Sequence, residues 1–423
     1  MDCLVNYFNQ YIIFNTVMKY IYIIDEYISS KKNGIGTYLR ELISSIKDGD
    51  IKICLISCCY DSETFQIEIK DGIKQLQFPV VHDLFGEYHN IIDKFLRLYI
   101  EDCQENIFIF NYGPCKLLLK SIKKSYPFSK LVFVVHDMAW TSFMLGDKVK
   151  LKEYLCKEKS NLLEKEYLNL TYLLEEEKEM FKIVDQIVVL VAETVEILQD
   201  VYNVCENRMA LIPNGLEDNY NKLSKNETSK LKNKLLIPQN EKIILFAGRV
   251  NEIKGIYPLL NSLKKVLHFY PNFRLVIAGT IFHTKLIMEC ANEIASKIVF
   301  TGQISNEKLK EWYQIADIGV LPSYSEQCSY TGIELMMNGI PVVASDGFGV
   351  SDMFRDGVNA KIARIGDRSK PIEFENNLSE SLLILLQSVD LRDKLSKSGR
   401  MVYERKYEIK QMKEKYQKLI YTL

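Results

Sequence analysis

The sequence predicts an α/β protein built from two doubly wound, Rossmann-like domains that face each other across a cleft. Short apolar runs rich in Ile and Val alternate with amphipathic segments of helix length, which is typical of parallel sheets covered by helices. The alternation stops in a polar stretch rich in Asn and Lys, residues 217–241, and then starts again. A chain of 423 residues also exceeds the size of one ordinary hydrophobic core.

The first half alternates predicted strands with predicted helices. Strands are expected at residues 20–24, 51–56, 107–110, 131–135 and 186–190, and helices at 35–46, 91–103 and 114–125. Residues 66–69 and 74–78 form a predicted hairpin, because Asp71-Gly72 supplies the turn between them. The stretch 148–183 is charged and helical in period, so we interpret it as helix with a solvated face.

The second half repeats the pattern. Strands are expected at residues 243–246, 274–278, 298–300, 318–321, 342–344 and 361–363. Helices are expected at 229–235, 257–269, 306–315, 333–338, 378–397 and 409–421, with Ser305 as the N-cap of the third. We therefore place an N-terminal domain at 1–207 and a C-terminal domain at 208–403, followed by a helical segment at 404–423.

Two interpretations stay open for residues 1–17. Met18 is followed by Lys19-Tyr-Ile-Tyr-Ile-Ile24, which has the pattern of a first buried strand, so Met18 is a candidate true start and the preceding residues a candidate extension. The alternative is a genuine N-terminal strand or helix.

The composition argues against a nucleic-acid binder, a metal protein and a membrane-spanning protein. The formal net charge is −1, whereas a dedicated nucleic-acid binder needs a basic face. Ten cysteines are present without a C-x-x-C pair or His at zinc-ligand spacing, so we expect reduced thiols and no metal site. No apolar run approaches the roughly 20 residues of a membrane-spanning helix. These features together predict a cytoplasmic protein.

Cationic side chains follow the first predicted strand of the second half. The segment Phe246-Ala-Gly-Arg-Val-Asn-Glu-Ile-Lys-Gly255 places Gly248, Arg249 and Lys254 beyond the carboxyl end of that strand. Ligands of open α/β sheets bind at this edge. The planar guanidinium and the compact ammonium suit the oxygens of a diphosphate. An exposed turn with ordinary surface cations would explain this segment taken alone.

Two glutamates separated by seven residues follow a later strand. Glu326 lies in the loop that starts with Pro322-Ser323, and Glu334 lies in the first turns of the next helix. Backbone N–H groups at Ser329, Tyr330, Thr331 and Gly332 would favour a bound anion such as phosphate. Glu334 could accept hydrogen bonds from a ribose diol. Helix capping would explain one glutamate near a helix start, but not the second one in the loop.

Weaker signals accompany this pair. Pro341-Val-Val-Ala-Ser-Asp-Gly-Phe-Gly349 reads as a strand and a Gly-rich turn, where backbone can approach a ligand closely. In the first half, Asn33-Gly-Ile-Gly-Thr-Tyr38 lacks the full dinucleotide fingerprint but makes Gly34 and Gly36 candidates for the cleft. Val135-His-Asp137 follows a buried strand, so a functional role for His136 is about as plausible as a structural one.

These elements together resemble the retaining glycosyltransferases of GT-B fold and of the family 4, or glycosyl transferases group 1, type. The matching residues are Gly248-Arg249…Lys254-Gly255, Pro322-Ser323…Glu326-x7-Glu334, and Pro341-Val342…Gly347…Gly349…Asp352 with Asp356-Gly357-Val358-Asn359. The resemblance covers most of residues 207–400. It departs from the family after the first glutamate, where the family often has Gly or Pro followed by Phe-Gly and this chain has Gln327-Cys328-Ser329-Tyr330, so no donor sugar is carried over.

The resemblance implies roles for the site residues. Arg249 and Lys254, with Gly248 beside them, would hold the diphosphate and stabilise its departure. Glu334 would bind the ribose, and Glu326 would lie near the sugar. His136 would lie near the reacting centre, and Gly34 and Gly36 would approach the donor phosphate or the acceptor. The N-terminal domain would receive the acceptor, and the segment 404–423 would pack back on it.

The resemblance also implies partners. It implies transfer of a hexose-type sugar from a nucleoside-diphosphate sugar to a hydroxyl of a glycan, a lipid-linked or another acceptor in bacterial cell-surface glycan synthesis, with no metal. A sugar-nucleotide epimerase, a phosphorylase of the same fold, and a non-catalytic glycan- or enzyme-binding protein stay open. The basic segment 116–130 fits either a solvated helix face, which we slightly favour, or peripheral contact with the inner face of the membrane.

Overall fold

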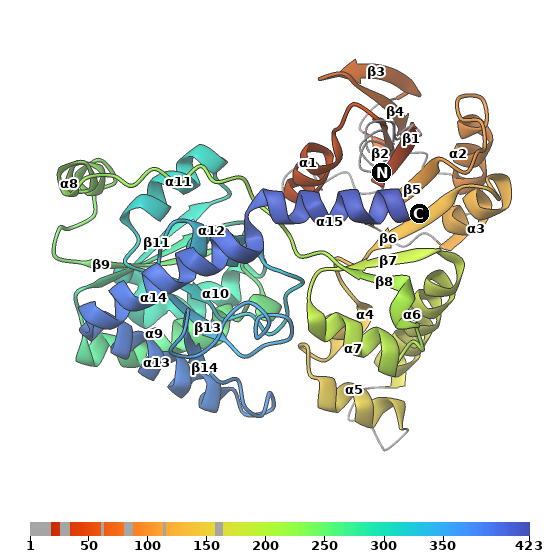
Figure 1. Ribbon diagram of the computed structural model, residues 1–423. Coiled ribbons are helices and arrows are strands. Elements are labelled where there is room, and N and C mark those ends of the chain that lie inside the picture. The colour runs from red at the N-terminus through yellow and green to blue at the C-terminus, as the bar shows by residue number, and fades with distance from the viewer. Residues whose placement is uncertain (1–17, 26–33, 61–62, 80–87, 113–115, 157–163) are drawn as a thin grey trace, which may run out of the picture.

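The computed structural model describes residues 18–25, 34–60, 63–79, 88–112, 116–156 and 164–423. It consists of two domains, each built around one sheet (Figure 1). The predicted fold class is therefore confirmed. The interpretations that concern residues 1–17, Asn33 and residue 114 fall outside the described residues.

The N-terminal sheet has eight strands in the order β3-β4-β2-β1-β5-β6-β7-β8. All neighbouring pairs are parallel except β3 with β4, which form the predicted hairpin. The strands are β1 (Lys19–Asp25), β2 (Ile51–Tyr60), β3 (Gln66–Lys70), β4 (Ile73–Pro79), β5 (Asn106–Tyr112), β6 (Lys130–Val134), β7 (Gln186–Val189) and β8 (Met209–Leu211). The helices are α1 (Gly34–Ile46), α2 (Tyr88–Leu96), α3 (Lys116–Ser125), α4 (Ala139–Phe143), α5 (Lys148–Leu155), α6 (Glu164–Ile183) and α7 (Ala192–Asp200).

The C-terminal sheet has six parallel strands in the order β11-β10-β9-β12-β13-β14. The strands are β9 (Lys242–Ala247), β10 (Phe273–Ala278), β11 (Ile298–Gly302), β12 (Ile318–Leu321), β13 (Val342–Ser345) and β14 (Lys361–Ala363). The helices are α8 (Lys225–Lys234), α9 (Ile256–Phe269), α10 (Thr284–Ala291), α11 (Asn306–Ile315), α12 (Tyr330–Met337), α13 (Pro371–Gln387) and α14 (Val389–Val402), and α15 (Ile409–Thr422) ends the chain.

Local sequence explains these elements well. The strand β12 is buried along its whole length, as expected for a parallel strand with helices on both faces of the sheet. Ser305 is the N-cap of α11, as predicted, since its hydroxyl accepts from the backbone N–H of Lys308. Ser224 and Glu227 form a reciprocal capping box at the start of α8.

Several predicted boundaries were wrong. The helix expected at 91–103 ends at Leu96, after which Leu98 is largely exposed. The helix expected at 378–397 is divided into α13 and α14, with Ser388 between them. The described residues of the stretch 148–183 are helical in α5 and α6, as its period predicts. The strand β8 belongs to the N-terminal sheet and lies beyond the boundary drawn after residue 207. A three-residue strand is too short to show a strand period in the sequence, although its residues are apolar.

The strand order fixes where a ligand can bind. In each sheet the order reverses at one point, between β1 and β5 in the N-terminal domain and between β9 and β12 in the C-terminal domain. Doubly wound sheets bind ligands outside the carboxyl ends of the strands at such a point. The turns after β9 and β12 are the segments that contain Arg249, Lys254 and Glu326.

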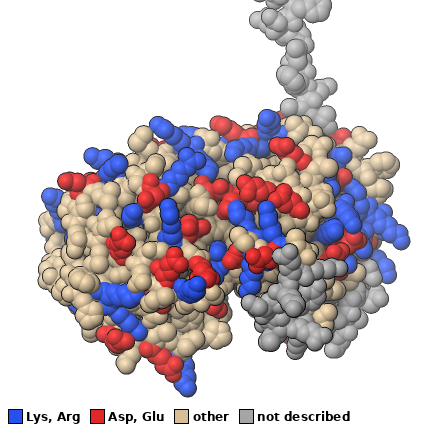
Figure 2. Space-filling model, turned by 90° about the horizontal axis from the view of Figure 1, so that it is seen from below, with Lys and Arg blue, Asp and Glu red and all other residues tan. Residues whose placement is uncertain are grey.

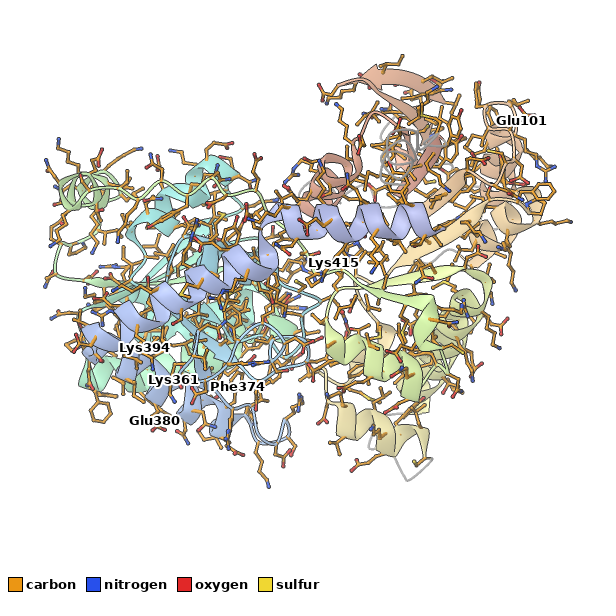
Figure 3. All side chains as sticks on the ribbon, viewed as in Figure 1. Glu101, Lys361, Phe374, Glu380, Lys394 and Lys415 are labelled. Carbon is orange, nitrogen blue, oxygen red and sulfur yellow. The ribbon has the colours of Figure 1, made fainter. Side chains whose placement is uncertain are left out.

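The chain crosses between the domains twice, and the two crossings touch. The backbone N–H of Leu216 donates to the carbonyl of Tyr407, and the N–H of Ile409 donates to the carbonyl of Leu216. A π-helical turn, Tyr403–Tyr407, precedes the second crossing. The helix α15 then lies along α1 of the N-terminal domain (Figure 1), where the hydroxyls of Tyr38 and Tyr416 are hydrogen-bonded. Lys415 extends from α15 toward β8 (Figure 3), and its Nζ lies 3.4 Å from the carbonyl oxygen of Leu211.

Basic and acidic side chains are mixed on the face shown in Figure 2. In the segment 116–130, Lys116 pairs with Glu176 and Lys123 pairs with Asp185 at 2.7 Å. Two of the lysines that suggested a basic face are therefore neutralised by the chain itself. Among the described residues, none of the helices combines the length and the apolar character that crossing a membrane requires.

Candidate active site

The turn after β9 contains two cationic side chains, of which one has an ion-pair partner among the described residues and the other has none there. Arg249 is exposed, and the described residues offer its guanidinium no ion-pair partner. Lys254 ends a short 3-10 helix, Glu252–Lys254, and its side chain is 18% exposed. Gly248 has a φ of 141°, a value that favours glycine, and the turn closes on Gly255 in the left-handed region. Arg249 is thus available to an anion, whereas Lys254 is already engaged.

Lys254 is engaged by Glu326. Its Nζ lies 2.7 Å from Glu326 Oε1, and the hydroxyl of Ser323 donates to the same oxygen at 2.7 Å. Glu326 is 9% exposed, so the two charges compensate each other in a site with little water. The structure therefore brings together two of the predicted catalytic residues, one from each turn at the strand-order reversal.

Glu334 lies in the second turn of α12. Burial raises the pKa of its carboxyl group, and a hydrogen bond from Tyr313 opposes that rise. The Tyr313 hydroxyl in α11 donates to Glu334 Oε2 at 2.6 Å. Tyr313 is itself buried and fixes one carboxylate oxygen. A residue on the apolar face of an amphipathic helix looks like an ordinary core residue in the sequence, so Tyr313 was not predicted.

The N-terminus of α12 lies beside the end of β9. The hydroxyl of Thr331 donates to the carbonyl of Ala247 at 3.1 Å, and Ser329 caps the helix by accepting from the N–H of Gly332. Among the described residues, the backbone N–H groups of Tyr330 and Thr331 have no hydrogen-bond acceptor. Such free N–H groups at a helix start attract an anion. The side chains of Ser329 and Thr331 thus build the site, and the backbone supplies its donors.

Loops of the two domains contact each other through hydrogen bonds between the start of α7 and the segments around Gln327 and Gly349. The carboxylate of Glu193, at the start of α7, accepts from the backbone N–H of Gly349 and from the hydroxyl of Ser351. In return, the backbone N–H of Glu193 donates to Asp352 Oδ2 at 3.0 Å. The hydroxyl of Thr194 donates to Gln327 Oε1 at 2.7 Å. The Gly-rich turn after β13 and the unusual Gln327 therefore contact the other domain.

A second set of interdomain contacts surrounds α4 and α5. Arg368 donates through Nε to the carbonyl of Leu145 at 2.9 Å, and its NH1 lies 3.4 Å from Asp147 Oδ2. The rings of Trp140 and Phe348 pack edge to face with centroids 5.1 Å apart. These contacts hold the two carboxyl-end edges against each other.

His136 lies at the carboxyl edge of the N-terminal sheet. Its Nε2 lies 3.1 Å from Asn111 Oδ1, and its ring packs edge to face on Tyr38 at 4.5 Å. Burial lowers the pKa of His136 to about 3, so the imidazole is neutral at physiological pH. Asn111 directly follows the apolar run 107–110, just as His136 follows an apolar strand, so the same reasoning from strand ends would have found it.

The two glycines of the N-terminal domain lie at the start of α1. A Cβ atom placed on Gly34 would lie 3.8 Å from the Tyr330 ring, so the start of α1 faces the start of α12 across the junction. Gly36 is buried within α1. The predicted site residues of the two domains are thus brought to one interdomain region.

Glu177 supports the loop that contains His136. Its Oε1 accepts from the N–H of Ala139 at 2.7 Å, and its Oε2 accepts from the hydroxyl of Tyr202. Burial raises the pKa of Glu177 to about 7. Because the folded pKa is the higher one, this carboxyl contributes stability that is full below about pH 4.3 and is lost as the pH rises through about 7.

Glu177→Gln should therefore remove part of the pH dependence of stability. We expect wild type and variant to have similar unfolding free energies at pH 5. At pH 8 the variant should be more stable by up to about 3 kcal/mol, because the carboxyl has a pKa of about 7 in the folded protein and about 4.3 in the unfolded chain. Urea unfolding at both pH values measures the difference. An equal difference between the two proteins at pH 5 and pH 8 would contradict the assignment.

A family model and similar sequences match part of the chain. A family model described as "Glycosyl transferases group 1" matches residues 227–401. The chain is 32% identical over 164 residues to an uncharacterised glycosyltransferase of Methanocaldococcus jannaschii, covering 38% of this chain and 42% of that protein. It is 28% identical over 161 residues to a lipopolysaccharide 1,2-N-acetylglucosaminetransferase of Salmonella typhimurium, covering 36% of this chain and 42% of the relative. The matches thus span about two-fifths of each of these relatives.

Solved structures resemble the whole molecule. Sucrose-phosphate synthase from Thermosynechococcus elongatus superposes with a TM-score of 0.75 at 16% identity, covering 96% of this chain and 98% of that one. Anabaena HepE, solved with UDP and glucose, superposes with a TM-score of 0.68 at 14% identity, covering 96% and 100%. At these identities the likeness shows the fold alone. Residues 227–401 therefore match the glycosyl transferases group 1 family, within a two-domain protein of the GT-B fold.

Proposed function

We propose that this chain is a retaining glycosyltransferase that moves a hexose-type sugar from a nucleoside-diphosphate sugar to an acceptor hydroxyl. One observation carries the proposal. The Lys254–Glu326 pair joins a cation suited to the leaving phosphate with a carboxylate suited to the sugar, at the strand-order reversal of the C-terminal sheet. The unpaired Arg249 and the free N–H groups at the start of α12 add donors for a diphosphate.

The relatives support this proposal. The family model matches residues 227–401, two of the similar proteins are named as glycosyltransferases, and HepE has been solved with UDP-glucose. By analogy, Glu334 would bind the ribose of a nucleotide. The nucleobase and the sugar are not inferred, because Gln327-Cys328-Ser329-Tyr330 stands where the resembling family often has Gly or Pro followed by Phe-Gly.

The chemistry balances without a cofactor. The bond between sugar C1 and the β-phosphate oxygen breaks, and the diphosphate leaves with that electron pair. The acceptor oxygen forms a bond to C1 on the same face, and its proton passes to the leaving phosphate oxygen. Arg249, Lys254 and the α12 N–H groups would stabilise the charge that develops on the phosphate. Since these groups supply the positive charge, we expect activity to survive EDTA.

The test begins with binding. Purified protein is mixed with a panel of nucleoside diphosphates, and the change in melting temperature is measured. At least one nucleotide should stabilise the protein, and the corresponding nucleotide-sugar should be turned over with retention at C1, which NMR of the product shows. Lack of stabilisation by every nucleotide would overturn the proposal. Turnover that survives both Glu326→Gln and Arg249→Ala would place the chemistry elsewhere, and binding without turnover would favour a non-catalytic protein.

The proposed acceptor is a hydroxyl of a glycan or of a lipid-linked molecule in cell-surface glycan synthesis, as the resemblance to the family implies. Peripheral membrane contact through the segment 116–130 would depend on Lys120, Lys124 and Lys130, because Lys116 and Lys123 are paired. Co-sedimentation with anionic vesicles, compared with a Lys120→Glu/Lys124→Glu variant, tests this contact.

Tyr313→Phe should weaken nucleotide binding without slowing the chemical step. Loss of the hydrogen bond to Glu334 Oε2 removes an interaction worth about 1.5 kcal/mol when one partner is charged, so we expect a roughly tenfold rise in Kd. The preference for a ribonucleotide over its deoxyribose counterpart should fall, while kcat stays near the wild-type value. Calorimetric titration measures the affinities, and steady-state kinetics measures kcat.

Tyr202→Phe is the matched control. It removes a comparable tyrosine–glutamate hydrogen bond, to Glu177 in the N-terminal domain. Nucleotide affinity should be unchanged in this variant. Equal losses of affinity in the two variants would mean that Tyr313 acts through general stability.

A further inference from the structure

We propose that Asn111 is a positioning residue that holds His136 in the tautomer with its proton on Nε2, so that Nδ1 faces the domain junction as a hydrogen-bond acceptor for a substrate hydroxyl. The role of the substrate hydroxyl rests on the proposed function. The tautomer itself does not, because it follows from contacts within the N-terminal domain.

A break in strand register places Asn111. Phe110 of β5 pairs with Ile24 of β1, and Tyr112 pairs with Asp25, so Asn111 is the extra residue between two paired ones. Such a bulge redirects a side chain and is common beside active sites. This one lies at the strand-order reversal of the N-terminal sheet, between β1 and β5. The backbone thus directs an amide toward the region where a ligand of this fold binds.

The contact with His136 sets the proton. The structure places the carbonyl oxygen of Asn111, and not its amide nitrogen, 3.1 Å from His136 Nε2. A carbonyl oxygen only accepts, so with the amide in this orientation Nε2 carries the hydrogen. A neutral imidazole has one N–H, and Nδ1 therefore holds the lone pair. Among the described residues no group hydrogen-bonds to Nδ1, and His136 is only half-buried.

The ring is held in place from other sides. The ring of Tyr38 packs edge to face on His136, and its hydroxyl is bonded to Tyr416 of α15. Asn111 is fully buried, and its Nδ2 has no partner in the part of the chain that the structure describes. The lowered pKa of His136, caused by burial, keeps the ring neutral, so it offers one donor and one acceptor. With Nε2 occupied by Asn111, the acceptor is what remains for a substrate.

Imidazole NMR tests the tautomer directly. The chain has five histidines, so a protein labelled with ¹⁵N-histidine gives few signals, and loss of a signal in His136→Gln assigns His136. We expect a proton on Nε2 and no titration between pH 5 and pH 8. Asn111→Ala should give a mixed or reversed tautomer. A proton on Nδ1 in the wild type, or an unchanged tautomer in Asn111→Ala, would overturn the proposal.

Two further variants sharpen the test. Asn111→Asp places a carboxylate against Nε2, which should raise the pKa of His136 and bring its signal into titration. Asn106→Ala removes a buried asparagine from the same strand, where its amide donates to the carbonyl of Glu101 at 2.8 Å. This control should leave the His136 tautomer unchanged. A tautomer change in Asn106→Ala as large as in Asn111→Ala would show that β5 as a whole, and not Asn111, sets the proton.

Kinetic measurements test the role of the tautomer in the reaction separately. Asn111→Ala should lower kcat about tenfold, as expected for loss of one oriented hydrogen bond, with little change in donor KM. Asn111→Asp should add a pH-dependent limb to the kcat profile that the wild type lacks. If the wild type transfers no sugar but its His136 has the expected tautomer, the proposed function fails and the positioning role stands. If kcat is unchanged in Asn111→Ala although the tautomer has changed, His136 Nδ1 does not accept from a substrate hydroxyl in the reaction.

Discussion

Lys254→Ala is expected to lower kcat/KM by about 10²–10³, which is the usual cost of removing one preorganised group that stabilises developing charge, roughly 3–4 kcal/mol. The substitution removes the cation nearest to Glu326 and leaves that carboxylate buried without its ion-pair partner. Steady-state kinetics with the nucleotide-sugar identified by the binding panel measures the loss. Nucleoside diphosphates should also stabilise the variant less in thermal unfolding.

Two variants separate chemistry from folding. Lys361→Ala breaks another partly exposed ion pair of the same domain, that of Lys361 with Asp356 at 3.2 Å, and should leave activity within twofold to threefold of the wild type, since such pairs are worth about 0–1 kcal/mol. The double variant Lys254→Ala/Glu326→Gln removes the orphaned charge, so its stability should recover while its activity stays low. Near-normal activity of Lys254→Ala would exclude a role in the reaction.

Gly255→Ala is expected to destabilise the C-terminal domain by about 3 kcal/mol, from a left-handed backbone strain of about 1–3 kcal/mol and a steric clash of similar size. Gly255 has a φ of 69°, and a Cβ atom there would lie 2.0 Å from the carbonyl oxygen of Pro322. The added methyl group, in the turn after β9, would thus collide with the backbone of the loop after β12. Relief of the clash would move Lys254 away from Glu326, so activity should fall together with stability.

Gly357→Ala is the control for this substitution. Gly357 has nearly the same φ, 66°, but a Cβ atom there would meet no other atom within 4 Å. It should therefore show only the backbone cost, about 1–2 kcal/mol, with activity preserved. Denaturant unfolding gives both values. Equal destabilisation in the two variants would mean that the contact with Pro322 is relieved at no cost.

The repeating pattern of apolar runs and amphipathic helices predicts most of this fold because it reports directly on burial. The strands of the C-terminal sheet are found where they were expected, since parallel strands with both faces covered consist of apolar residues. The errors fall on β8, on the end of α2 and on the division between α13 and α14. Short length, exposure or a one-residue break leaves no periodic signal at these places.

The site was predictable in its residue types but not in its contacts. Arg249, Lys254, Glu326 and Glu334 stand out because charged residues follow buried strands. The bond from Tyr313 to Glu334 and the bond between Asn111 and His136 join segments far apart in the chain, and single-sequence spacing contains no such information. The same is true of Glu193, which looks like an acidic residue in the first turn of α7 and in fact binds the turn at Gly349.

The double crossing at Leu216 restricts how the domains can move. Two segments of backbone joined by hydrogen bonds at one place leave rotation about that place as the motion that costs least, whereas sliding or separation would break them. Loops distant from the crossing, such as the one between α4 and α5 and the one between β14 and α13 (Figure 1), would travel farthest in such a rotation. The Arg368 contacts would then be the interdomain contacts that break first when the domains rotate apart. Distance probes near residues 145 and 368 would report this separation with the greatest sensitivity.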